Sequence, residues 1–170
     1  MNWAAAVIHG LIWSALWGLP IMLMLLWWPQ LWLHDYPPAL RKVIVLPPLG
    51  GKRKAAAYSL VSIWALAVFA FLFWSVLHTY RSLPVSFSTL FRHAFTMTLL
   101  WNLLDLVILD WGVFCTWRPA FIVLPGSEGH PAYRDYRFHA IGFLKGCLIS
   151  GAGAALCAAI CFAVLNRWLW

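Results

Sequence analysis

The sequence predicts an all-α, polytopic membrane protein built as a bundle of four transmembrane helices. Apolar residues make up 64% of the chain and charged residues only 10%, and the mean hydropathy is +0.80. Soluble domains average about 45–50% apolar and about 25% charged residues. Four apolar runs each reach the roughly 20 residues that a transmembrane helix needs. At 170 residues the chain fits one domain.

The predicted spans cover about residues 3–33, 55–77, 87–114 and 139–165. The first is longer than a bilayer requires, and Pro20 predicts a kink or tilt within it. Small residues recur every four positions in the first and last spans: Ala6, Gly10, Ser14 and Gly18, then Gly142, Gly146, Ser150, Ala154 and Ala158. Such ladders let helices approach closely in lipid. We expect these two spans to pack through them, within one subunit or between subunits of a homo-oligomer or membrane partner.

The net charge is +7, and most basic residues lie between the spans. Membrane topology and contact with anionic lipid explain that pattern, so we expect the lipid bilayer, and no nucleic acid, as a partner. Eight of the twelve Lys and Arg residues lie within the first and third connections. The positive-inside rule therefore predicts a multi-pass protein of a bacterial inner (plasma) membrane, with both long connections in the cytoplasm and both termini outside.

The third span contains acidic residues that are energetically costly to place inside a bilayer. Asp105 and Asp110, two of only five acidic residues, follow Asn102 within an apolar run. An ionisable group inside a bilayer is a functional hypothesis by default. On a straight α-helix the two carboxylates are about 140° apart, so both cannot chelate one ion. We expect a structural ion pair of Asp105 with Lys145 of the fourth span, supported by Asn102. The alternative is that these groups form the floor of a cytoplasm-facing cavity.

Other polar groups are expected on the same side of the membrane as Asp110. Asp135 and His139 are four residues apart and share one helix face. The predicted site binds a small ligand, an ion or a lipid headgroup, and its candidate residues are Asp35, Asp110, Glu128, His130, Tyr133, Asp135 and His139. Carboxylates and imidazoles also bind metals, so a metal site is a further interpretation. The sequence leaves metal, cofactor and catalytic residues open.

Two resemblances add to this interpretation. The run His130-Pro131-Ala132-Tyr133 resembles the Arg-His-Pro-x-Tyr signature of membrane methyltransferases that act on isoprenylcysteine or phospholipids, with Gly129 in place of the Arg. That resemblance implies an alternative function as a membrane-embedded enzyme, either methyl-transferring or metal-dependent. A third possibility is an accessory or scaffold subunit whose acids only pack.

The chain also resembles a family of small bacterial four-helix membrane proteins to which no function is assigned. The matching segments are Leu33–Pro37, Asn102–Trp111, Pro125–Gly129 and Tyr133–His139, with Gly142-Phe143 following. This resemblance implies a shared architecture and a shared polar cluster on the cytoplasmic side, and it implies no reaction.

Overall fold

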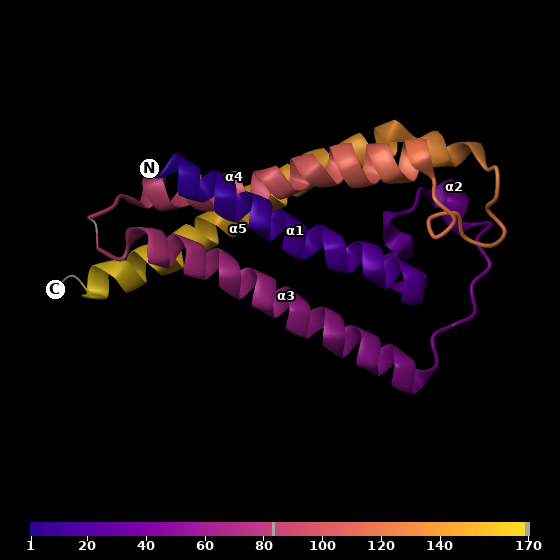
Figure 1. The fold of residues 1–170 in the computed structure, drawn as a ribbon, viewed down its shortest axis with the longest axis horizontal. Coiled ribbons are helices and arrows are strands. Elements are labelled where there is room, and N and C mark those ends of the chain that lie inside the picture. The colour runs from indigo at the N-terminus through magenta and orange to yellow at the C-terminus, as the bar shows by residue number, and fades with distance from the viewer. Residues whose placement is uncertain (83, 169–170) are drawn as a thin grey trace.

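A computed structural model describes residues 1–82 and 84–168. In this part of the chain all regular structure is helical, and four helices are long and apolar enough to cross a membrane. They form an elongated bundle, with both termini at one end and both long connections at the other (Figure 1). The predicted fold class is therefore confirmed, as is the expectation that the two long connections lie on the same side.

The spanning helices differ from the predicted spans mainly at their ends. They are α1 (Trp3–Trp27), α3 (Gly51–Tyr80), α4 (Phe87–Leu104) continued by the π-helix η2 (Asp105–Trp117), and α5 (Tyr136–Trp168). Helix α1 ends six residues before the predicted residue 33, because a proline at position 29 cannot donate a backbone hydrogen bond and disfavours a helical residue before it. Trp28 has non-helical backbone angles, with φ −138° and ψ 58°, and a 3-10 helix, η1 (Pro29–Asp35), follows.

Helix α4 is the centre of the bundle, since both α1 and α5 pack along it. A methyl group added at Gly10 of α1 would lie 2.8 Å from a side-chain carbon of Leu100, and one added at Gly146 of α5 would lie 2.6 Å from Asn102 Oδ1. Within the described chain both small-residue ladders thus contact α4 and not each other, whereas packing of the ladders between subunits stays a prediction. Small residues predict a close approach but do not identify the helix that approaches.

The α4–α5 contact gives a matched pair of variants. Gly146→Ala is expected to displace the Asn102 side chain, whose Nδ2 donates to Ser150 Oγ, and to lose about 1 kcal/mol, the net contribution of a hydrogen bond. Gly142→Ala, one turn away, should lose nothing, because an added methyl group there meets no atom within 4 Å. Melting temperatures in detergent compare the two variants. Equal melting temperatures would show that Asn102 does not hold the helices together.

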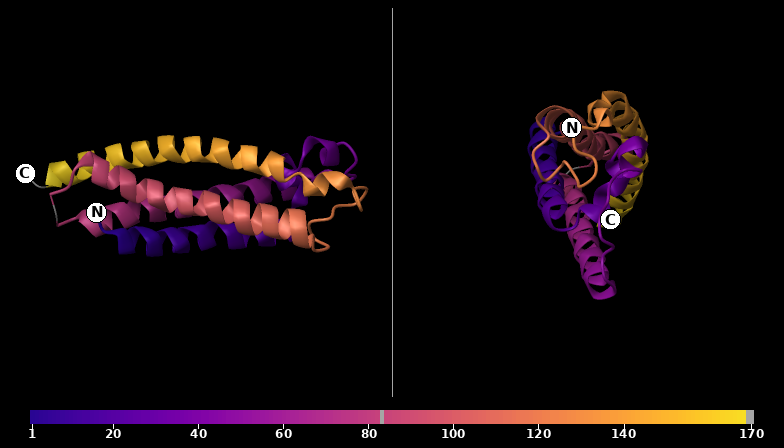
Figure 2. Two further views of the ribbon diagram at one scale, coloured as in Figure 1. Left: turned by 90° about the horizontal axis from the view of Figure 1, so that it is seen from above. Right: turned by 90° about the vertical axis from the view of Figure 1, so that its right-hand side faces the viewer.

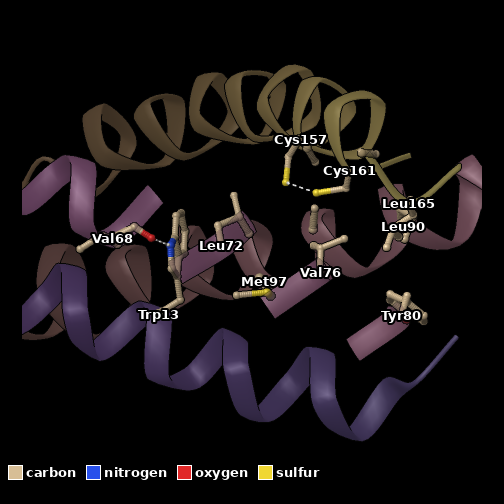
Figure 3. Packing of buried hydrophobic residues seen from close by; sticks show 13 residues of the cluster. Trp13, Val68, Leu72, Val76, Tyr80, Leu90, Met97, Cys157, Cys161 and Leu165 are labelled. Atoms are coloured by element: carbon tan, nitrogen blue, oxygen red, sulfur yellow. Dashed lines mark hydrogen bonds between the residues drawn. The ribbon is translucent and has the colours of Figure 1, made fainter. Parts of the chain in front are cut away.

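Helix α3 closes the bundle only at the end that carries the termini. There Val68, Leu72 and Val76 are buried against Trp13 of α1 and Cys157 of α5 (Figure 3). The indole of Trp13 donates to the carbonyl of Val68 at 2.9 Å. This apolar core holds the second half of α3 against the other three helices.

A buried polar chain joins α1, α3 and α4 beside this core. Ser75 Oγ of α3 lies 2.8 Å from His9 Nδ1 of α1 and 2.9 Å from His93 Nε2 of α4. Tyr80 OH lies 3.3 Å from His93 Nδ1 and accepts from the backbone N–H of Asn2. Because buried polar groups need partners, this chain fixes how the three helices meet.

The first half of α3 leaves the bundle. From Gly51 to Leu66 only Ala57 is buried, and the helix diverges from α1 toward the end that carries the connections (Figures 1 and 2). The last contact before the divergence is made by Trp64, whose indole donates to the carbonyl of Leu16 at 2.9 Å and whose ring lies 4.5 Å from that of Trp17. Beyond this point the bundle consists of three helices.

The two long connections pack into a second apolar core at the end of the bundle from which α3 has diverged. Tyr36 and Tyr133 are each 1% exposed, and both donate a hydroxyl to the carbonyl of Ile122, at 2.9 and 3.2 Å. Phe114 of η2 packs between the two tyrosine rings. The connections therefore form a structured cap over the ends of α1, η2 and α5.

Candidate functional site

A pocket of about 470 Å³ lies under this cap. Its walls come from the second half of α1, from η1, from α4 and η2, and from the first turns of α5. Three of the five acidic residues of the chain face it. The polar lining consists of His34, Asp35, Asn102, Asp105, Asp110, His139 and Lys145. Apolar side chains such as Ile21, Met22 and Trp101 supply the rest of the lining.

The π-helix brings the two carboxylates of the third span to one pocket. In η2 the backbone is bonded five residues back, as in the 2.8 Å bond from the Arg118 N–H to the carbonyl of Val113. Residues five apart therefore lie nearly one turn apart, which places Asp105 and Asp110 on the same wall. The expected separation of about 140° does not hold, because it assumed a straight α-helix.

Asp110 and His139 form the best-ordered polar pair of the site. His139 Nδ1 lies 2.9 Å from Asp110 Oδ1, and the two side chains are 4% and 25% exposed. Since the carboxylate accepts, Nδ1 carries the proton, and the orientation of the imidazole is fixed. The ring also packs against Phe114 and Phe138. Both residues were predicted as candidates, and the structure brings them together.

Two buried nitrogen atoms in the pocket lining have no partner. His139 Nε2 and Trp32 Nε1 are buried and make no hydrogen bond within the described residues. With Nδ1 protonated, a neutral His139 offers Nε2 as an acceptor, whereas an indole N–H only donates. Buried polar atoms are nearly always bonded to protein, water or ligand. Both atoms are covered by the surrounding protein, so they are unbonded polar groups within the pocket wall.

Asp35 stands at the outer rim of the pocket. Its carboxylate lies 3.2 Å from His34 Nε2. Removal of water by the surrounding protein raises its pKa, the neighbouring His34 opposes this rise, and the Asp110 carboxylate adds to it. Because 57% of the side chain remains exposed, water screens these effects. Asp35 is the candidate residue of the first connection that reaches the site.

Lys145 and Asp105 both line the pocket but do not form the predicted ion pair. The ion pairs found among the described residues are His34–Asp35 and His139–Asp110. Lys145 is exposed and Asp105 is half-buried, and no ion pair joins them in the described part of the chain. Asn102 donates to Ser150 of α5 and not to a member of the predicted pair.

The other predicted residues of the third connection are used to build the cap. Glu128 Oε2 accepts from the backbone N–H of Gly126, and His130 Nδ1 accepts from that of Ala132, where it begins the 3-10 helix η3 (Pro131–Arg134). Asp135 Oδ1 accepts from the Phe138 N–H at 2.9 Å and caps α5. Tyr133 is buried in the cap core. None of these four residues lines the pocket.

The positions of these residues also bear on the hypothesis that the polar cluster binds a metal ion. Glu128, His130 and Asp135 each bond the backbone within three residues of themselves, so they do not converge with His139. Within residues 1–82 and 84–168 there is no group of three or more His, Cys, Asp or Glu residues arranged to hold a metal ion. The carboxylates of the pocket face an imidazole and an ammonium group instead.

Fold and site together define an all-α polytopic protein with an acidic pocket at the end of the bundle that carries the connections. Comparisons with protein-family models, curated proteins and solved structures find no match for this chain. The functional argument therefore rests on the residues of the pocket.

Proposed function

We propose that the chain is an integral protein of a bacterial inner membrane that binds a small ligand, an ion or a lipid headgroup in this pocket. The observation that carries the proposal is the pocket lining, in which three carboxylates stand beside two buried nitrogen atoms without partners. A pocket of about 470 Å³ lies within the range of roughly 300–1,000 Å³ for small-molecule sites. The excess of Lys and Arg at this end supports a cytoplasmic location for the pocket.

The charge of the lining favours a ligand with a positive group. Asp35, Asp105 and Asp110 face one ammonium, that of Lys145. A cationic group that enters among these carboxyl groups gains charge-assisted hydrogen bonds. A purely structural role for the acids is less consistent with the lining, because a packing interface leaves no open pocket between the acids.

A thermal-stability screen tests this function. The purified protein is melted with potassium chloride, magnesium chloride, ethanolamine or a phosphatidylethanolamine–detergent mixture, and a ligand that binds only the folded state raises the melting temperature. At least one of these additions is expected to stabilise the wild-type protein and to have a smaller effect on Asp110→Asn.

The matched control for this screen is Glu128→Gln, which changes an acidic side chain outside the pocket. It should respond as the wild-type protein does. If every addition acts equally on the wild-type protein and on Asp110→Asn, the acids only pack and the scaffold interpretation is correct.

The Asp110–His139 pair favours one alternative, a membrane-embedded enzyme. A carboxylate that orients an imidazole and leaves Nε2 free is the arrangement of a general base. Mass analysis of the stabilising ligand after incubation separates the two functions. Conversion by the wild-type protein but not by His139→Gln would establish catalysis, and an unchanged ligand would establish binding alone.

A further inference from the structure

The pocket has an open fourth side. Its lining comes from α1, η1, α4, η2, α5 and the connection residues Tyr36 and Ile122, and includes no residue of α3. At the opposite end α3 fills the fourth side of the bundle with Val68, Leu72 and Val76. Near the pocket, however, it has diverged, and between Gly51 and Leu66 only Ala57 is buried. The first half of α3 therefore does not separate the pocket from the lipid.

The pocket also separates its charges across two walls. Asp105 and Asp110 project from η2, whereas Lys145 projects from α5. A ligand that satisfies both walls carries an ammonium group for the carboxylates. It also carries an anionic, acceptor-rich group for the lysine.

The depths of these groups follow the order of groups in a phospholipid. Asp35 lies in η1 outside the spans, and His139 lies three residues inside α5. Lys145 is six residues further along, about 9 Å deeper, and a lysine side chain can extend back toward the interface. In a zwitterionic phospholipid of the same leaflet, the ammonium group is outermost, the phosphate lies below it, and the chains lie deepest.

Resting on the proposed function, we propose that the pocket binds the headgroup of an amine-bearing zwitterionic phospholipid that enters sideways along α3. The ammonium group, outermost, is held by Asp35 and Asp110. The phosphate, below it, is held by Lys145. The acyl chains remain in the bilayer beside α3, where the apolar side chains of Leu60 and Ile63 are exposed.

Lipid retention tests this inference. The protein is reconstituted into vesicles of equal parts phosphatidylethanolamine and phosphatidylglycerol with identical acyl chains, re-extracted in mild detergent, and its bound lipids are counted by mass spectrometry. The wild-type protein should retain the ethanolamine lipid in about tenfold excess, the ratio given by one charge-assisted hydrogen bond. Asp110→Asn should lower this ratio toward one.

Two further variants keep the test independent of folding. Lys145→Met keeps a long side chain but removes the phosphate contact, so it should retain less of both lipids and give a lower total count. Glu128→Gln should match the wild-type protein, because Glu128 lies outside the pocket. Equal retention of the two lipids by the wild-type protein would overturn the inference.

A titration with the free headgroup distinguishes the two sources of the same chemical group, the lipid and the soluble compound. Phosphoethanolamine in solution is titrated against the protein in detergent, and the melting temperature is followed. The lateral route predicts stabilisation by the lipid and at most a small effect of the free headgroup. Equal stabilisation by both would overturn lipid entry but leave the proposed function intact. If no addition, lipid or soluble, distinguishes the wild-type protein from Asp110→Asn, the proposed function fails as well.

Discussion

A Gly126→Ala variant should be among the least stable single substitutions in this chain. Gly126 has a φ of +86°, and an added methyl group would lie 2.5 Å from the carbonyl oxygen of Val43. The left-handed backbone costs a non-glycine residue about 1–2 kcal/mol, and forcing atoms into an occupied space costs about 1–3 kcal/mol more. The neighbouring bond from the Val45 N–H to the carbonyl of Pro125, at 2.9 Å, joins the two connections. Its loss would open the cap over the pocket.

Gly129→Ala is the matched control for this prediction. Gly129 also has a positive φ, +70°, but an added methyl group meets no atom within 4 Å. It should lose only the backbone contribution of about 1–2 kcal/mol. Melting temperatures in one detergent compare the variants. A Gly129→Ala variant as unstable as Gly126→Ala would mean that backbone strain alone matters and that the contact between the connections does not hold the cap.

Removal of the His139 side chain is expected to have the second large effect. In His139→Phe the carboxylate of Asp110, 25% exposed, loses its imidazole partner in the pocket wall. Breaking a buried pair by deleting one partner costs about 3–5 kcal/mol, and the partial exposure of Asp110 places the expected loss near the lower end. Asp110→Asn should cost less, because an amide oxygen still accepts from Nδ1 and no buried charge is left unpaired.

A double-mutant cycle tests this coupling. The Asp110→Asn/His139→Phe variant should be more stable than the two single losses predict by about 1–3 kcal/mol, the interaction energy of residues in contact. Denaturation midpoints in a single detergent provide the four values. Additive losses would contradict the pairing and would remove the support for an oriented imidazole in the site.

Much of the architecture could be predicted from composition and spacing. Apolar runs long enough to cross a bilayer define the spans regardless of how they pack. Because successive spans alternate in direction, the first and third connections, which are the two long ones, lie at the same end. From that topology we expected Asp35, Asp110 and His139 on the same side, although they lie far apart in the sequence. The structure brings these three residues to one pocket.

The backbone geometry of the third span could not be predicted in the same way. Apolar patterning indicates a helix but does not distinguish bonds to the fourth preceding residue from bonds to the fifth. The 13-residue η2 therefore changes which side chains share a face. Asp105 and Asp110 were expected on different faces, and the wider turn places them on one wall.

The roles of the connection residues could have been predicted in part. Asp135 precedes a long apolar helix, and His130 precedes Pro131 at the start of a turn. Aspartate and other short polar side chains before a helix commonly cap it, and proline is favoured at the first helical position. Those local signals favoured capping over ligand binding. Trp32, by contrast, carried no sequence signal, because its unbonded indole nitrogen is a feature of the folded pocket.

Native mass spectrometry of the protein, extracted directly from its own membrane, is the most direct test of the central claim that this pocket holds a ligand. The wild-type protein should carry a non-covalent adduct of defined mass. The adduct should be absent from both Asp105→Asn and Asp110→Asn, which alter the pocket wall, and present in Glu128→Gln, which does not. Identical spectra for all four proteins would contradict the account and would leave the acidic residues as packing elements.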